Sequence, residues 1–338
     1  MKWNYLKRLM IKLLTGSFKT DHSWIEEQIR SMSLAEAIAK VDWVFGCDRL
    51  LQEFDQDLTI PYYIQSEWAY QTFHSPEGGI HLALNFDGVF NPDGYYAQPR
   101  IVGEQIAKNN ARQVLELGSG KGFNGAFLAN QYPDVDFVGI DVTPLHIEIS
   151  SQKAKPYPNL RFQQGDFNQL EFPDSSFDLV FGIECLCYTQ DPELCLAEIF
   201  RVLRSGGKLV VFDSYRYSKF ANFSDLFQTA TKLVEMSMVV RSGFDEFQDW
   251  SMAAESVGFE IEMVEDLYSA ILPNILRLQK LAILFFLSSW RAKLLTYLLP
   301  KYLIQNSIAG LLMPYTLKPP ERSLAYYQIV LTKPHLKS

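Results

Sequence analysis

The chain has 338 residues, of which 48% are hydrophobic and 21% charged, so it can form about two domains and is not disordered throughout. A net charge of −8 argues against a general nucleic-acid binder. The four cysteines form no C-x-x-C pair and lack an accompanying His cluster, so we expect reduced thiols, a cytoplasmic protein and no metal site.

The first 16 residues, MKWNYLKRLMIKLLTG, place apolar side chains at helical spacing and basic side chains on the other side. Lys12 interrupts the apolar stretch, so the segment is not typical of a secretory signal. Such a helix either lies on an anionic membrane surface or docks on the protein itself. Both interpretations stay open.

Helices are expected over residues 20–50 and around 97–110, separated by a turn-rich, aromatic region over 60–100. From residue 111, short β-rich runs alternate with helical stretches, which predicts an α/β fold with a mostly parallel sheet. The runs are VLEL (114–117), FVGI (137–140), LRFQQ (160–164), FDLVFGI (177–183), KLVVFD (208–213), FEIEMV (259–264) and LAYYQIVLT (324–332).

The stretch between the last two runs is too long for a loop, and its apolar spacing predicts a helical insertion. Within residues 278–304 the uncharged apolar run covers only residues 281–290, so a transmembrane helix is disfavoured. The interpretations that remain are a buried helix, a peripheral membrane contact and a homodimer interface.

A glycine-rich turn stands out at residues 114–125, VLELGSGKGFNG, between a buried strand and a helix expected at 126–130. Its glycines let the backbone approach a ligand, and a helix N-terminus offers free N–H groups. Phe123 stands where a dinucleotide-binding turn has its third glycine, and no G-K-[ST] follows. Glu116 suits a ligand that carries a cationic group.

This turn resembles motif I of class I S-adenosylmethionine (SAM)-dependent methyltransferases. Four segments resemble further motifs of the family in the same order: Gly139-Ile140-Asp141, Gln164-Gly165-Asp166-Phe167, LEFPDSSFD (170–178) and EIFRVLRSGG (198–207). The resemblance implies a Rossmann-like, seven-stranded, mostly parallel sheet, methyltransferase activity and SAM as cofactor.

The implied organisation has four parts. They are an N-terminal helical cap or substrate region (1–100), a SAM-binding core (101–266), a helical insertion that forms a lid or substrate wall (267–322) and a final strand that completes the sheet (323–338).

The family's SAM-binding residues transfer to matching positions. Asp141 would accept the ribose hydroxyls, and Asp166 the adenine amine, with Phe167 stacked on the ring. Tyr62 and Tyr63 would close over the amino-acid part of SAM, or form an aromatic core pair. The implied SAM-contacting set is Glu116, Gly118, Ser119, Gly120, Gly122, Asp141, Val142, Asp166, Phe167, Ile183 and Tyr63.

Residues 182–188, GIECLCY, resemble the IEATCHA stretch of sterol 24-C-methyltransferases, and SEWAYQTFH (66–74) loosely resembles that family's aromatic region. The resemblance implies C-methylation of an alkene, isoprenoid or sterol-like lipid. Glu184 would act as base or cation stabiliser. Secondary candidates are Tyr188, His81, His74 and Tyr215; a structural role also explains each histidine.

The substrate expected from this resemblance is a hydrophobic small molecule, but functions other than C-methylation stay open. One is an O-methyltransferase that acts on a natural-product or quinone hydroxyl. Another is a SAM-fold protein that binds a partner or membrane without catalysis. A nicotinamide-dependent oxidoreductase is disfavoured by the glycine spacing. We expect a cytoplasmic protein, with membrane association as an alternative.

Overall fold

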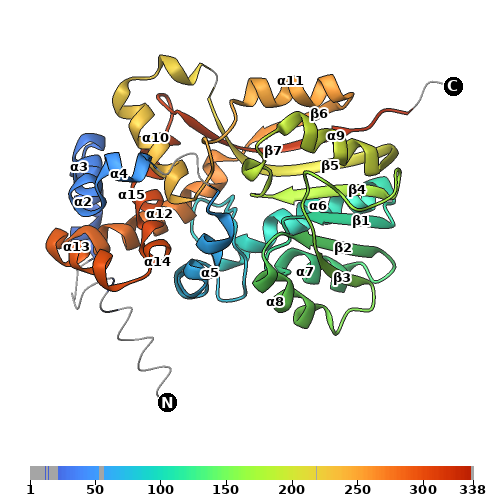
Figure 1. The fold of residues 1–338 in the computed structure, drawn as a ribbon, viewed down its shortest axis with the longest axis horizontal. Coiled ribbons are helices and arrows are strands. Elements are labelled where there is room, and N and C mark those ends of the chain that lie inside the picture. Colours follow the sequence, from blue (N-terminus) through green and yellow to red (C-terminus); the bar gives the residue numbers. More distant parts are fainter. Residues whose placement is uncertain (1–11, 13, 15–21, 53–56, 218, 336–338) are drawn as a thin grey trace. The chain divides into compact units, whose positions relative to one another are not determined.

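The computed structural model describes Lys12, Leu14 and residues 22–52, 57–217 and 219–335 (Figure 1). Apart from Lys12 and Leu14, the predicted amphipathic helix of residues 1–16 lies outside the described residues. The chain divides into two compact units. The sheet unit comprises Glu67–Lys219, Phe244–Ile271 and Leu324–Ser338, and the helical unit comprises Met1–Ser66, Phe220–Gly243 and Leu272–Ser323.

The sheet has seven strands in the order β3-β2-β1-β4-β5-β7-β6 (Figure 1). The strands are β1 (Gln113–Leu117), β2 (Asp136–Asp141), β3 (Leu160–Gln164), β4 (Phe177–Ile183), β5 (Leu203–Arg216), β6 (Glu260–Asp266) and β7 (Leu324–Thr332). Only β7 runs antiparallel to its neighbours. This arrangement confirms the predicted Rossmann-like sheet.

Both faces of the central strands of the sheet are buried. The neighbouring residues Val114 and Leu115 of β1, and Val210 and Val211 of β5, all have an exposed fraction of 0%. Since successive side chains of a strand point to opposite faces, helices or loops must cover the sheet on each side. Continuous apolar runs such as FDLVFGI are the sequence signature of this burial.

Two groups of helices accompany the strands in the sheet unit. Helices α6 (Ala97–Asn109), α7 (Phe123–Gln131) and α8 (Pro144–Ala154) pack in sequence against one another. Helices α9 (Pro192–Val202) and α11 (Phe247–Val257) pack together, and both contribute to the main hydrophobic core. Short helical turns are Tyr70–His74, Pro92–Tyr96 and Leu186–Tyr188.

The helical unit is built from α2 (His22–Ser31), α3 (Leu34–Phe45), α4 (Cys47–Leu51), α10 (Asp225–Ser237), α13 (Ser289–Leu298), α14 (Lys301–Gln305) and α15 (Ser307–Thr316), with a short turn at Phe220–Asn222. Ser33 begins α3 with a capping box, because its side chain and that of Glu36 each bind the other's backbone N–H. Helices α10 and α15 pack closely, and Gln305 donates to the carbonyl of Met236 at 2.9 Å.

Two helices contain residues of both units: α5 (Thr59–Ala69) and α12 (Tyr268–Phe286). In the described part of the chain, α12 is the one helix long and apolar enough to span a bilayer. However, 56% of its most apolar window is buried, as in the core helix of a globular protein.

The compact units differ from the predicted boundaries, most extensively in two places. Residues 67–100, expected in the N-terminal part, belong to the sheet unit, where the N–H of Asn85 donates to the carbonyl of Ala270 at 2.7 Å. Residues 220–243, expected in the core, join the helical unit because Leu233 and Val234 of α10 are buried there. Pattern alone did not indicate that α10 leaves the sheet.

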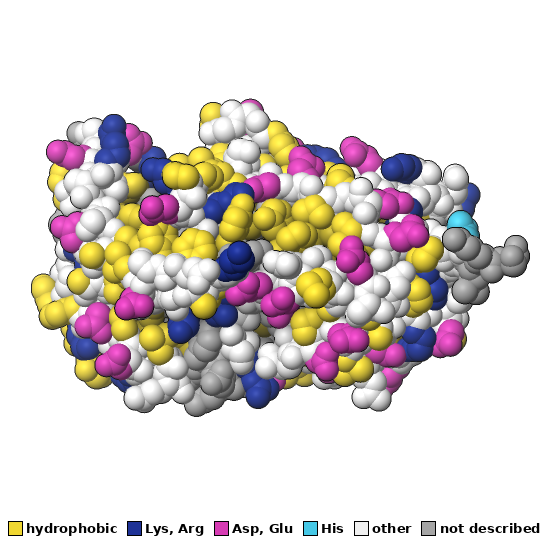
Figure 2. All heavy atoms as spheres, turned by 90° about the horizontal axis from the view of Figure 1, so that it is seen from above, with side chains coloured by type: hydrophobic (Ala, Val, Ile, Leu, Met, Phe, Trp, Pro, Cys, Tyr) yellow, Lys and Arg dark blue, Asp and Glu magenta, His cyan; other side chains and the backbone are white. Residues whose placement is uncertain are grey.

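One face of the molecule is drawn in Figure 2. On it, described acidic and basic side chains are interspersed with hydrophobic ones.

Candidate active site

The glycine-rich turn connects β1 to α7 at the carboxyl end of the sheet, where doubly wound folds bind ligands. Gly118 has φ +56°, in the left-handed region that favours glycine. A Cβ there would overlap the Cβ of Cys185, which follows β4. Two independent constraints therefore require glycine at the first position of the motif.

Asp141, the last residue of β2, holds this turn in place. Its Oδ2 accepts from the N–H of Gly120 at 2.8 Å, and its Oδ1 accepts from the N–H of Thr143 at 2.8 Å. His146 Nδ1 lies 3.2 Å from Oδ1. Burial alone would raise the pKa of Asp141, but these hydrogen bonds outweigh it and hold the pKa below its usual range. The carboxylate is therefore a fixed negative charge beside the turn.

Glu116 lies beneath the same turn and is almost fully buried. Its Oε1 accepts from Asn124 Nδ2 at 3.1 Å, and burial raises the pKa of Glu116 to about 8, against the opposing hydrogen bonds. Among the described residues, Glu116 Oε2, Ser119 Oγ and Asn124 Oδ1 are buried without a hydrogen-bond partner. Orphaned polar atoms around a glycine turn fit a polar ligand such as SAM.

The other predicted SAM contacts occupy different environments. Asp166 is exposed and its Oδ1 accepts from Asn168, whereas Phe167 is buried in the main core. Val142 follows Asp141 and is half-buried. Ile183 ends β4 and is buried.

Tyr62 and Tyr63 lie on α5 in the helical unit. The Tyr62 ring is fully buried against Tyr63 and Tyr302, and its hydroxyl donates to Asn306 Oδ1 at 2.5 Å. The aromatic-core interpretation thus describes the surroundings of Tyr62, and the role of Tyr63 toward SAM stays a prediction.

Glu184 follows β4 and has the most constrained backbone of the predicted catalytic residues, with φ +51°. A non-glycine residue with φ in the left-handed region is strained. The Glu184 backbone is held in this conformation by its N–H, which donates to the carbonyl of Phe212 at 2.7 Å. Its Oε1 accepts from the N–H of Leu82 at 2.7 Å and from the hydroxyl of Tyr326 at 2.8 Å. Oε2 accepts no hydrogen bond from any described residue.

The protonation of Glu184 is set by opposing effects. Burial raises its pKa to about 7, although the hydrogen bonds from Leu82 and Tyr326 lower it. The nearby Asp213, on β5, contributes a further increase; its own pKa is raised to about 6 by burial. A carboxyl group poised near neutral pH can take up or release a proton during a reaction.

The secondary candidates have identifiable structural contacts. His81 is buried, its Nε2 lies 2.9 Å from the carbonyl of Tyr95, and burial lowers its pKa to about 4. His74 Nε2 lies 2.7 Å from the carbonyl of His81. Tyr188 and Tyr215 both pack in the main core. The structure therefore gathers the histidines around Tyr95, while Glu184 has other partners.

Sequence reasoning missed several residues of this region. The clearest is Lys121, inside the glycine turn, which is buried and forms an ion pair with Glu67 at 3.2 Å. Leu82, Tyr326 and Asp213 were also missed as neighbours of Glu184. The charged Lys121 in an otherwise small-residue turn was the one available signal.

The two remaining motifs, at residues 170–178 and 198–207, are joined by hydrogen bonds. Arg201 donates to the carbonyls of Leu170 and Phe172 and to the carboxylates of Asp174 and Glu198, at 2.7–2.9 Å. Asp178 accepts from the N–H groups of Arg112 and Gln113. These motif residues fix loops at the amino ends of strands and need no catalytic role.

Residues 115–211 match the protein family described as "Methyltransferase domain". This part of the chain is similar to methyltransferase domains. The match covers β1 through most of β5, which includes the glycine turn, Asp141 and Glu184. It confirms the family resemblance read from the sequence motifs. Among the described residues, no group of three His, Cys, Asp or Glu side chains is placed to hold a metal ion.

Characterised relatives match this domain. The phthiotriol/phenolphthiotriol dimycocerosates methyltransferase of Mycobacterium leprae is 36% identical over 31% of this chain and 38% of its own length. The sterol 24-C-methyltransferase of Candida albicans is 28% identical over 56% of this chain and 50% of its own length. The matched region thus spans about half or less of these relatives.

The fold is shared more widely than the sequence. The [4+2]-cyclase SpnF has a TM-score of 0.63 at 17% identity, over 82% of this chain and 96% of its own. That similarity shows the fold alone. A cyclase on this fold also means that activity must be argued from the site.

Proposed function

We propose that this chain is a SAM-dependent methyltransferase that adds a methyl group to a carbon atom of a hydrophobic small molecule. Glu184 carries the proposal. It is an enclosed carboxyl group with a pKa near neutral, one oxygen fully hydrogen-bonded and the other free of described partners.

The residues of the glycine turn would hold SAM. Asp141 presents a fixed carboxylate to the ribose, and the orphaned oxygens of Glu116 and Ser119 offer acceptors near the turn. Glu116 would also favour the cationic amino group of the ligand, which would lower the raised pKa of its carboxyl group. When bound, SAM supplies an electrophilic methyl group on a sulfonium.

Glu184 would act on the substrate side. When the π electrons of an alkene form the new carbon–carbon bond, the adjacent carbon becomes cationic. The Glu184 carboxylate stabilises that charge, and its Oε2 accepts the proton whose loss restores a double bond. Tyr326 and Leu82 hold Oε1, so they aim Oε2 and keep the carboxyl group from rotating.

An apolar substrate is supported by two observations. The sterol 24-C-methyltransferase relative covers more of this chain than the M. leprae relative does. The insertion that follows β6 is also strongly apolar, with buried residues throughout α12–α15. Lipid or isoprenoid alkenes are the class that these features favour.

Incubation of the chain with methyl-labelled SAM and a lipid extract tests the proposal. We expect label in an organic-soluble product whose NMR spectrum shows a new methyl group on carbon. A methoxy signal instead would replace C-methylation by O-methylation of a hydroxyl. SAM binding without any labelled product, with lipid or polar extracts, would favour a non-catalytic SAM-fold protein.

A further inference from the structure

Helix α13 carries an apolar stripe that the rest of the described chain leaves uncovered. Trp290 and Tyr297 have exposed fractions of 68% and 74%, and Leu294 and Leu298 are also exposed. These residues recur at the spacing of one helical face, while Ala292 and Leu295 on the opposite face are buried. A contiguous stripe of this kind on a folded protein marks an interaction surface.

The charge of the surrounding segment is opposite to that of the protein. Residues 267–320 contain six Lys or Arg residues and no Asp or Glu, although the chain carries −8 in total. Residues 1–20 likewise contain five basic residues and no acidic one. Leu14, a described residue of this second segment, accepts a hydrogen bond at its carbonyl from Arg291 Nη2 at 3.5 Å.

Basic residues flank the stripe on both sides. At 3.6 residues per turn, Arg291 and Lys293 lie at opposite edges of the stripe, and the Arg291 guanidinium donates to the carbonyls of Leu284 and Phe285 at 2.7 and 3.1 Å. Lys293 Nζ donates to the carbonyl of Trp43 at 3.2 Å, and the Trp43 side chain, on α3, is itself half exposed. Trp43 therefore extends the aromatic surface from α13 onto α3.

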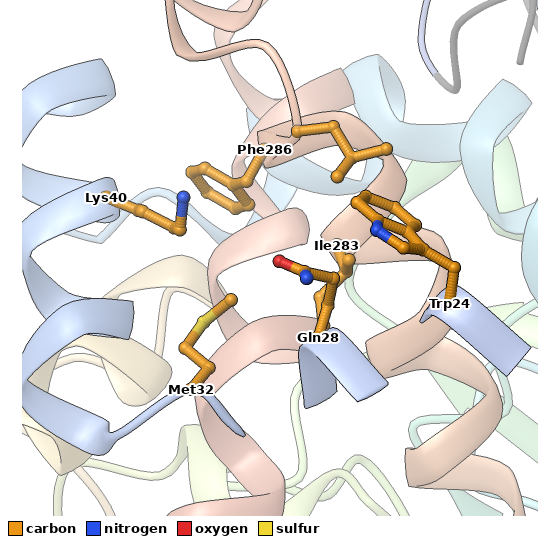
Figure 3. A pocket seen from close by; sticks show the side chains of 7 residues that line it. Trp24, Gln28, Met32, Lys40, Ile283 and Phe286 are labelled. Carbon is orange, nitrogen blue, oxygen red and sulfur yellow. The ribbon is translucent and has the colours of Figure 1, made fainter. Parts of the chain in front are cut away.

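A pocket of about 430 Å³ lies in the same helical unit, lined by Trp24, Gln28, Met32, Lys40, Ile283, Phe286 and Leu287 (Figure 3). Lys40 and Trp43 are three residues apart on α3 and so are neighbours on its surface. The pocket is apolar apart from Gln28 and Lys40 (Figure 3). Apolar lining with one cation suits the end of an anionic amphiphile.

We propose that the α13 stripe, with Trp43, docks this chain on an anionic lipid surface. Trp and Tyr side chains favour the membrane–water interface, and Leu294 and Leu298 would insert between the headgroups. Basic residues near such a surface are attracted to its negative charge. A second copy of the chain is a poorer occupant, because two copies would bring the same positive segment together. The proposal stands whatever molecule is methylated.

Vesicle co-sedimentation of the full chain tests this surface. The vesicles are phosphatidylcholine alone, or with about 30 mol% phosphatidylglycerol to supply a negative surface. We expect the chain to bind the anionic vesicles, and Trp290→Ser combined with Tyr297→Ser to weaken binding about tenfold or more. Raising the salt concentration should weaken wild-type binding, since the attraction is screened.

The matched control is Met252→Ser, which removes an exposed apolar side chain from α11 in the sheet unit and should leave binding unchanged. Equal binding of the double variant and the wild type would overturn the proposal. Equal binding of neutral and anionic vesicles, or a dimer that the double variant dissociates while vesicles are ignored, would overturn it as well.

Discussion

The hydroxyl of Tyr326 donates to Oε1 of Glu184 at 2.8 Å, across 142 positions of the chain. Tyr326 lies on β7, the antiparallel strand that is inserted between β5 and β6. The last strand of the sheet thus reaches back to the residue that follows β4. The proposed catalytic carboxyl group is positioned by the completed sheet, and a truncated chain would lose that support.

Replacing Tyr326 by Phe should move the pH dependence of methyl transfer. The Tyr326 hydrogen bond lowers the pKa of Glu184, which burial raises to about 7. Without the hydroxyl the pKa of Glu184 rises further, so the ascending limb of kcat/KM against pH shifts to higher pH. Tyr327→Phe, one residue along on the opposite face of β7, is the control and should leave the midpoint in place. An unshifted midpoint in Tyr326→Phe would remove its positioning role.

Asp141→Asn should weaken SAM binding by two orders of magnitude or more. The Asn side chain would direct one amide group at the donors that now face the Asp141 carboxylate, so both the glycine turn and the proposed ribose contact would be disturbed. Calorimetric titration with SAM measures the effect. Asp136→Asn, on an exposed residue at the other end of β2, should bind SAM as the wild type does. Equal affinities would show that the motif register is wrong.

Gly118→Ala should abolish SAM binding and destabilise the fold by about 2 kcal/mol or more, since it combines a left-handed backbone with a steric overlap. Gly88→Ala separates the two effects: Gly88 has φ +76°, but its Cβ would meet nothing within 4 Å. That variant should lose about 1 kcal/mol and keep its affinity for SAM. Denaturant unfolding and calorimetry give both quantities. Similar losses in the two variants would contradict the close approach of Cys185.

Glu116→Gln should change how stability depends on pH. The pKa of Glu116 rises from 4.5 to about 8 on folding, because the carboxyl group is buried. The native state therefore holds the proton more tightly than the unfolded chain, and stability falls as the pH rises from 4.5 to 8. The neutral amide removes that loss, so the variant gains at most about 4 kcal/mol relative to the wild type between pH 5 and pH 8. Urea unfolding at several pH values measures the difference, and parallel curves would refute it.

The strands could be predicted because a strand that is buried on both faces has a continuous run of apolar residues. The runs at 160–164, 177–183 and 324–332 coincide with β3, β4 and β7. By contrast, β5 extends from Leu203 to Arg216, well beyond the predicted KLVVFD, because it pairs with β4 at one end and with β7 at the other. Strand length there is a tertiary property.

The candidate site could be predicted only where its residues lie close together in the sequence. Glycines with positive φ and the carboxylate that ends β2 form a recognisable motif, so the glycine turn proposed to bind SAM could be predicted. The partners of Glu184 could not, since Leu82 is 102 residues away and its contribution is a backbone N–H without any side-chain signature. The ion pair of Lys121 with Glu67 could not be predicted either, because the two residues are 54 positions apart in the sequence.

Methyl transfer by the Glu184→Gln variant tests directly whether the Glu184 carboxylate takes part in the reaction. The substitution keeps the shape of the side chain but removes the proton acceptor at Oε2. We predict that the variant binds SAM as tightly as the wild type, while transfer of labelled methyl into organic-soluble product falls about a hundredfold and no longer rises with pH near 7. A variant that transfers label at the wild-type rate, with the same pH profile, would contradict the account.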